Sequence, residues 1–147
     1  MSRFATPVLA AALLLAAAGC AGDDATRVTL TNEDCTYEGP DSVKAGTVAL
    51  DIENESGEVG TFELVQLDAA SGDEELEAYV TAEQGRIDGG DEPQGTPDFV
   101  TGVLRVEVDP GEVSVLTAGL TAGDHAVLCS TGVPATSVHA TASFEAT

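Results

Sequence analysis

The chain has 147 residues and a formal net charge of -21, with 26 acidic residues against 5 Lys and Arg. This charge excludes nucleic-acid binding, because phosphate contacts need Lys and Arg, and it opposes flat docking on an anionic lipid surface. Aromatic residues make up 4% of the chain and Trp is absent, so the core has to be mostly Val, Leu and Ile. The length suggests one domain, and the many Val, Thr and turn residues favour strands over helices.

Residues 1–19 have the pattern of a bacterial export signal. Arg3 supplies the charged start, and residues 8–18 form an apolar stretch that is too short to span a membrane. The small residues before Cys20 resemble the lipobox of bacterial lipoproteins, in which the cysteine thiol is diacylated and the cysteine becomes the new N-terminus.

The lipobox resemblance implies a location at the cell envelope. It predicts a lipid anchor at Cys20, a short tether over residues 20–26 and a folded domain over residues 27–147. The acyl chains would hold this domain on the extracytoplasmic face of the membrane. The alternative is an ordinary secretory peptide cut near Ala18, which leaves Cys20 as a spare thiol.

Alternation of apolar and polar residues predicts the strands of the domain. In chain order, the expected strands cover residues 27–31, 47–53, 61–68, 101–108, 112–117, 124–129 and 137–146. Turn signals separate them, among them Asp109-Pro110-Gly111. Short strands at such spacing are typical of a β-sandwich or a barrel.

Two expected strands have clear inward faces. In residues 101–108 the inward set is Leu104, Val106 and Val108. In residues 137–146 the inward set is Val138, Ala140, Ala142 and Phe144. This register puts His139 on the opposite face, where we expect it to be solvated.

An acidic insertion over about 69–100 interrupts the series of strands. Residues 74–84 are expected to form a short helix, with Leu76, Tyr79 and Val80 on one face. Residues 88–97 are rich in Gly, Asp and Pro and predict an irregular loop. Insertions of this length are usually functional or mobile.

The pattern of the domain resembles cupredoxins, and in particular the cupredoxin-like domain of periplasmic iron-uptake lipoproteins. The matching positions are Cys35, Gly46, Asn54, Pro110, Gly111, Leu120, Gly123 and Cys129. The resemblance implies an all-β fold, a Greek-key β-sandwich with a partly helical acidic insertion. It also implies a place outside the cytoplasm and a link to metal handling. His125 stands where those relatives commonly carry Tyr.

A blue-copper site needs two His, a Cys thiolate and usually a weak axial Met. Cys129 and His139 would supply two ligands, but Thr61 and Phe62 stand near the place of the upstream His. The only Met is Met1, which leaves with the leader. We therefore expect no copper site and no other cofactor.

Cys129 has a competing use as the partner of Cys35. Once Cys20 is acylated, two cysteines remain in an oxidising compartment, which favours a disulfide. Closing a loop of this size would stabilise the fold by roughly 4–5 kcal/mol in the chain-entropy model. Two free thiols or a thiolate metal site remain as alternatives.

Two further groups of residues have a structural and a functional interpretation. His125 shares a strand face with Cys129 and is expected to be a buried structural residue, with a metal ligand or pH sensor as the alternative. Asp88, Asp91, Glu92 and Asp98 belong either to a mobile acidic loop or to a set of oxygen ligands for calcium.

The sequence contains no Ser-His-Asp order, zinc-protease motif or phosphate loop, so we do not expect an enzyme. The favoured function is that of a monomeric, membrane-anchored binding module without copper, accessory to metal (iron) uptake, with a protein partner at the envelope. One alternative is an electron-transfer protein with an atypical copper centre. Another is a structural or interaction lipoprotein that acts through its acidic insertion.

Overall fold

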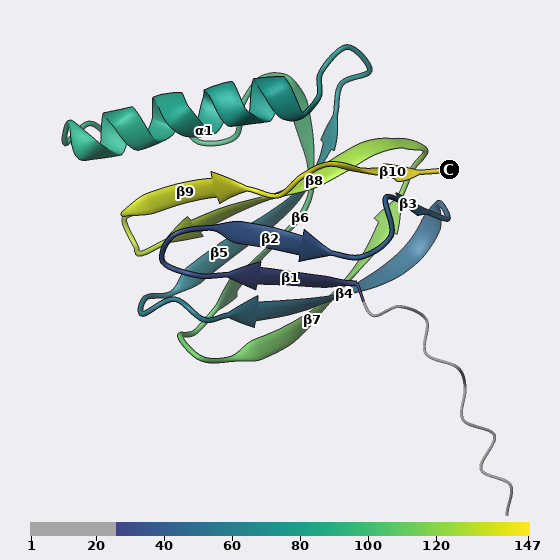
Figure 1. Ribbon diagram of the computed structural model, residues 1–147, viewed down its shortest axis with the longest axis horizontal. Coiled ribbons are helices and arrows are strands. Elements are labelled where there is room, and N and C mark those ends of the chain that lie inside the picture. The colour runs from purple at the N-terminus through teal and green to yellow at the C-terminus, as the bar shows by residue number, and fades with distance from the viewer. Residues whose placement is uncertain (1–25) are drawn as a thin grey trace, which may run out of the picture.

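The computed structural model describes residues 26–147, which form two β-sheets packed face to face with one helix outside them (Figure 1). The first sheet has four strands, in the order β2 (Cys35–Glu38), β1 (Arg27–Leu30), β4 (Gly46–Asn54) and β7 (Val113–Leu120). Strand β4 begins at Gly46 and ends at Asn54, one residue beyond the expected 47–53 at each end, and both of these residues are matching positions of the cupredoxin resemblance.

The second sheet contains the remaining strands. Its order is β3 (Ser42–Val43), β10 (Phe144–Ala146), β8 (Gly123–Thr131), β5 (Gly60–Leu67) and β6 (Val100–Val108), and β9 (Ser137–Ala140) also pairs with β8. Both sheets are mixed, because β1 runs parallel to β4 and β10 runs parallel to β3.

The chain crosses between the two sheets in the middle of the domain. After β6, which pairs antiparallel with β5, the chain enters the first sheet as β7, beside β4, and returns to the second sheet as β8, beside β5. Such returns of a strand to the side of an earlier one define Greek-key connections. The predicted all-β Greek-key sandwich is therefore confirmed.

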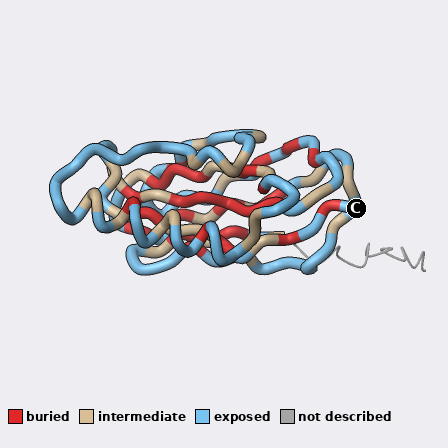
Figure 2. The backbone as a smooth tube through the Cα atoms, turned by 90° about the horizontal axis from the view of Figure 1, so that it is seen from above, coloured by how far each residue is buried: buried red, intermediate tan, exposed pale blue. Residues whose placement is uncertain are grey.

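The main core fills the space between the sheets, where the buried segments of the backbone run through the centre of the molecule (Figure 2). Its largest fully buried members are Phe62, Phe144, Leu30, Leu50, Ile52 and Leu64. A smaller core, which includes Leu76, Val65 and Leu128, lies on the outer face of the second sheet under the helix. Strand β8 is therefore buried on both faces. This explains why five consecutive residues, from His125 to Cys129, are all buried.

The helix α1 (Asp73–Asp88) lies in the acidic insertion and is longer than the expected 74–84. Three acidic residues occupy its first turn and Arg86 its last, which complements the helix dipole at both ends. The Glu75 carboxylate accepts a hydrogen bond from the Gly72 amide at 2.8 Å and closes the first turn. Asp88 is the last residue of the helix and not the first residue of a loop.

Glycines form the two turns that flank β7. Gly111 has φ 76° and Gly123 has φ 133°, values that residues with a Cβ adopt only at a cost. The amide of Gly111 donates to the carbonyl oxygen of Asn54 at 2.8 Å and holds the Asp109-Pro110-Gly111 turn against the end of β4.

Three expectations about strands were wrong. Residues 137–146 form two strands and not one. The strand breaks at Thr141, whose amide donates to the Val127 carbonyl oxygen and whose hydroxyl accepts from the Val127 amide. Ala142 is consequently exposed. Leu104 pairs with Leu64 but is 40% exposed, since β6 is the edge of its sheet. The cupredoxin resemblance also implies that Cys35 lies in an early loop, but it lies on a strand, since β2 pairs along β1.

Candidate functional site

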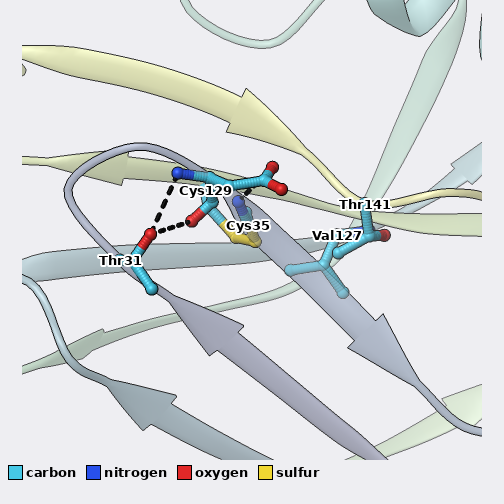
Figure 3. Close-up of a disulfide and its surroundings, with 6 residues drawn as sticks. Thr31, Cys35, Val127, Cys129 and Thr141 are labelled. Carbon is cyan, nitrogen blue, oxygen red and sulfur yellow. Dashed lines mark hydrogen bonds between the residues drawn. A yellow bond between two sulfur atoms is a disulfide. The ribbon is translucent and has the colours of Figure 1, made fainter.

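Cys35 and Cys129 form a disulfide that joins the two sheets (Figure 3). Cys35 opens β2 in the first sheet and Cys129 lies on β8 in the second, with their Cα atoms 6.2 Å apart. Both side chains are buried in the main core, with 2% and 1% exposure. The predicted pairing is confirmed, and the free-thiol and thiolate alternatives do not apply to this state.

The turn before Cys35 is fixed by hydrogen bonds. The hydroxyl of Thr31 accepts from the Asp34 amide at 3.1 Å and donates to the Asp34 carbonyl oxygen at 3.3 Å. The carboxylate of Asp34 in turn accepts from the Cys35 amide at 2.7 Å. This turn leads the chain into Cys35, whose sulfur is bonded to Cys129 of β8; Val127 of β8 and Thr141, which follows β9, are also shown (Figure 3).

The residues present do not fit a blue-copper centre. The Cys129 sulfur is bonded to Cys35 and is no thiolate. His125 lies four positions along the same strand from Cys129, about 13 Å at the usual strand rise. Within residues 26–147 there is no Met, and no group of three or more His, Cys, Asp or Glu lies close enough to hold a metal ion.

His125 is a fully buried residue of the main core, as the sequence predicts. Its Nδ1 lies 2.9 Å from the Gly123 carbonyl oxygen, and its ring stacks on Phe144 with 5.9 Å between ring centroids. Its Nε2 is buried without a hydrogen-bond partner. Burial lowers the pKa of His125, against smaller raising effects of the Gly123 carbonyl and Asp124, so the ring is held neutral.

His139 is not on a solvated face, contrary to the expectation. It pairs with Cys129 across the β8–β9 ladder, so its side chain is on the face that carries the disulfide. Its Nε2 is buried without a partner, and burial lowers its pKa while the nearby Asp34 raises it. The error comes from the break at Thr141. The prediction treats residues 137–146 as one continuous strand, and it therefore assigns His139 to the wrong face.

The acidic residues proposed for calcium do not come together. Asp88 accepts a hydrogen bond from Gln84 at 2.8 Å, and the backbone carbonyl of Glu92 accepts two from Arg86. Asp91 and Asp98 are exposed. Among the described residues none of these four belongs to a cluster of potential metal ligands.

The segment after α1 folds back onto the helix through Glu83. Glu83 is 1% exposed, and its Oε2 accepts a hydrogen bond from the Gln94 amide at 2.8 Å. Its Oε1 lies 3.6 Å from Nε of Arg86, which itself donates to the Glu92 carbonyl oxygen at 3.3 Å. The Tyr79 hydroxyl donates to the Gly95 carbonyl oxygen and adds a second attachment of this segment.

A cavity of about 220 Å³ lies between α1, this returning segment and the outer face of the second sheet. Its polar lining comes from Thr61, Glu63, Tyr79, Glu83, Thr96, Arg105 and Ser130. Burial, followed by the charges of Glu83 and Glu63, raises the pKa of Tyr79 to about 12, so the hydroxyl stays protonated. This cavity is our candidate functional site.

The sequence patterns do not identify this cavity. Leu76, Tyr79 and Val80 lie on one face of the predicted helix, and all three are buried or half-buried in the structure. Helical spacing extends that face to Glu83, seven residues after Leu76. This spacing was the available signal, since an acidic residue on the inner face of a helix is unusual.

The Cys20 anchor, the leader and most of the tether lie outside the described residues. Within residues 26–147, no helix has the length and apolar character needed to cross a membrane.

Comparison with known proteins identifies similar structures but no family. No family model and no curated protein matches the chain. Dithionite-reduced auracyanin from the photosynthetic bacterium Roseiflexus castenholzii is 19% identical, with 79% of this chain and 94% of that chain covered and a TM-score of 0.42. Azurin iso-2 from Methylomonas sp. strain J is 12% identical, with 82% and 98% covered and a TM-score of 0.41.

A third structure is auracyanin A, a blue copper protein from Chloroflexus aurantiacus, at 15% identity and a TM-score of 0.41 with 79% and 98% covered. These proteins are cupredoxins.

Proposed function

We propose that the chain is a lipid-anchored, extracytoplasmic binding module built on a cupredoxin-like sandwich that does not hold copper. It has no enzymatic activity and acts as an accessory to metal uptake, together with a protein partner at the envelope. Its acylated Cys20 inserts in the lipid bilayer, and the acidic domain stands off from the headgroups.

The observation that supports this proposal is the disulfide between Cys35 and Cys129. Disulfides persist in secreted and envelope proteins and are rare in the cytosol, which supports a location outside the cytoplasm. The same bond occupies the sulfur that a copper relative would use as a thiolate ligand. This argues against the alternative of an electron carrier with an atypical copper centre.

Metabolic labelling tests the anchor. In a bacterial host supplied with a palmitate analogue, the full-length protein should be labelled and should sediment with membranes. Cys20→Ser is the matched variant and should be unlabelled and released. A wild-type protein that carries no lipid would overturn the anchored form of the proposal.

Copper titration tests the second half of the proposal. The purified full-length protein should develop no intense visible absorption band when Cu²⁺ is added, because no thiolate is free to bind it. Mass spectrometry of the alkylated, non-reduced protein checks the disulfide in the same sample. An intense band from a preparation whose Cys35 and Cys129 are both free thiols, as shown by alkylation of a separate aliquot without copper, would favour the electron-transfer alternative.

A further inference from the structure

The cavity under α1 has an unusual distribution of charge. Buried carboxylates in proteins are normally paired or fully hydrogen-bonded, because an isolated buried charge is costly. Glu83 is 1% exposed but has one hydrogen bond, from the Gln94 amide, and a longer contact of 3.6 Å to Arg86. A carboxylate offers about four lone-pair sites. Glu83 therefore retains acceptor capacity on the wall of the cavity.

A second carboxylate lies on the floor of the cavity. Glu63 belongs to β5, and the Thr96 hydroxyl lies 3.1 Å from its Oε1 and 3.2 Å from its Oε2. Both Glu83 and Glu63 are close enough to Tyr79 to act on the charge of its hydroxyl. The two carboxylates thus come from opposite walls, one from the helix and one from the sheet.

The third charged group is Arg105, directly opposite Glu63 in the β5–β6 ladder. The ion pairs formed within residues 26–147 are Arg27–Glu53 and Arg86–Glu83, and Arg105 takes part in neither. Arg105 lines the cavity and is exposed, so its guanidinium can bind a carboxylate in a bidentate manner. The remaining walls are largely apolar and include Leu128, Val138 and Pro93.

We propose that this cavity binds a small zwitterion, namely a free α-amino acid with a short apolar side chain. Its ammonium group lies between the carboxylates of Glu83 and Glu63, its carboxylate is bound by Arg105, and its side chain contacts the apolar wall. The volume of about 220 Å³ is below the roughly 300–1,000 Å³ of drug-sized sites, so the ligand has to be small. This inference does not depend on the lipid anchor or on the absence of copper.

Isothermal titration calorimetry of the purified full-length protein with L-valine and L-alanine tests the proposal directly. Saturable binding of at least one of them is expected, and absence of heat and of any thermal shift at millimolar concentration with both would overturn it. Glu83→Gln should weaken binding by about 10-fold or more, which corresponds to about 1.4 kcal/mol. The Gln carbonyl still accepts the Gln94 amide, so the attachment of the segment is retained.

A control and a second variant separate binding from folding. Glu77→Gln changes an exposed carboxylate of the same helix and should leave the affinity unchanged. Glu63→Gln removes the second carboxylate from the sheet and should weaken binding by a similar factor, even if Glu83→Gln does not fold by circular dichroism. Wild-type affinity in a folded Glu83→Gln or Glu63→Gln variant would contradict the proposed position of the ammonium group.

The role of Arg105 is tested with a ligand that lacks the carboxylate. Isobutylamine is L-valine without this group, and it should bind the wild-type protein about 10-fold more weakly or worse. Arg105→Gln should remove this preference and leave the two ligands nearly equal. If isobutylamine binds the wild-type protein as well as L-valine does, the site selects cations and the zwitterion proposal is wrong.

Discussion

The side-chain amide of Asn54 donates a hydrogen bond to the carbonyl oxygen of Val108 at 2.8 Å, across 54 positions of sequence. Asn54 is the last residue of β4 in the first sheet, and Val108 is the last residue of β6 in the second. The same Nδ2 also donates to the Glu58 carbonyl oxygen, and Oδ1 accepts from the amide and the hydroxyl of Ser56. One fully buried amide thus joins the ends of strands from both sheets.

Asn54→Ala should therefore be strongly destabilising. It leaves the Val108 carbonyl and the Ser56 hydroxyl with fewer partners in a buried place and opens a small cavity, at a cost of about 2–3 kcal/mol. Urea unfolding followed by circular dichroism measures the loss. Glu55→Ala, at the exposed neighbouring position, should change the free energy of unfolding by less than about 0.5 kcal/mol. Equal effects of the two variants would show that the Asn54 network contributes little.

Removal of the disulfide should have a larger effect. Cys35 and Cys129 are 94 positions apart, and cross-links of that span are expected to stabilise by about 4–5 kcal/mol in the chain-entropy model. The double variant Cys35→Ala, Cys129→Ala should lose a comparable free energy of unfolding in urea. Wild-type protein that is unfolded and assayed under a strong dithiol reductant serves as the control and should approach the double variant. A loss below about 1 kcal/mol would mean that packing alone holds the two sheets together.

The strands that the sequence predicts well are those with one clear inward face. Val48, Leu50 and Ile52 alternate with small or polar residues, so β4 has only one register that buries them. The short strands β2 and β3 lack this signal, since the first carries Cys35 among polar residues and the second has two residues. They form because longer neighbours provide partners for their backbone groups, which is a tertiary effect.

The cavity under α1 was harder to predict for a related reason. Among 26 acidic residues, the sequence does not mark Glu83 as buried. Glu83 is buried because the segment around Gln94 folds back over the helix. Hydrogen bonds to Glu83 and from Tyr79 hold that segment in place, so the burial and the loop conformation depend on each other. Helical spacing from Leu76 predicts the face of Glu83, but the contact that buries it depends on the loop conformation.

Tyr79 should have a distinct signature at high pH. The chain has 2 Tyr, and burial raises the pKa of both, that of Tyr79 to about 12 and that of Tyr37 above its usual value. The folded state then holds the Tyr79 proton more tightly than the unfolded state, whose pKa is about 10. Its contribution to stability is present below about pH 10 and is lost as the pH rises toward 12.

Ultraviolet absorbance of tyrosinate measures this titration. Tyr79→Phe should remove the component near pH 12 and leave that of Tyr37. It should also weaken the fall in the free energy of unfolding above pH 10. A wild-type protein in which both tyrosines ionise near pH 10 while the fold is intact would contradict the burial of this hydroxyl.

Because of His125, we expect the free energy of unfolding to fall at acidic pH, the opposite direction to the effect of Tyr79. Burial lowers its pKa in the folded state, whereas the unfolded chain takes up the proton near its usual pKa of about 6.5. The unfolded state thus binds more protons below this pH, so the stability that the neutral ring contributes is present above about pH 6.5 and is lost as the pH falls through the folded-state pKa. His139 has its pKa lowered too and adds to the same trend.

Histidine proton resonances followed by NMR should show both rings titrating below the usual range. His125→Phe should keep the aromatic contact with Phe144 and reduce the loss of unfolding free energy between pH 7 and pH 5. His139→Gln gives the matched comparison, because it removes the other ring that titrates in this range. His125→Phe could instead leave the pH dependence of stability unchanged while His139→Gln abolishes it. In that case His125 has no part in acid sensitivity, and His139, which pairs with Cys129 across the β8–β9 ladder, is responsible for all of it.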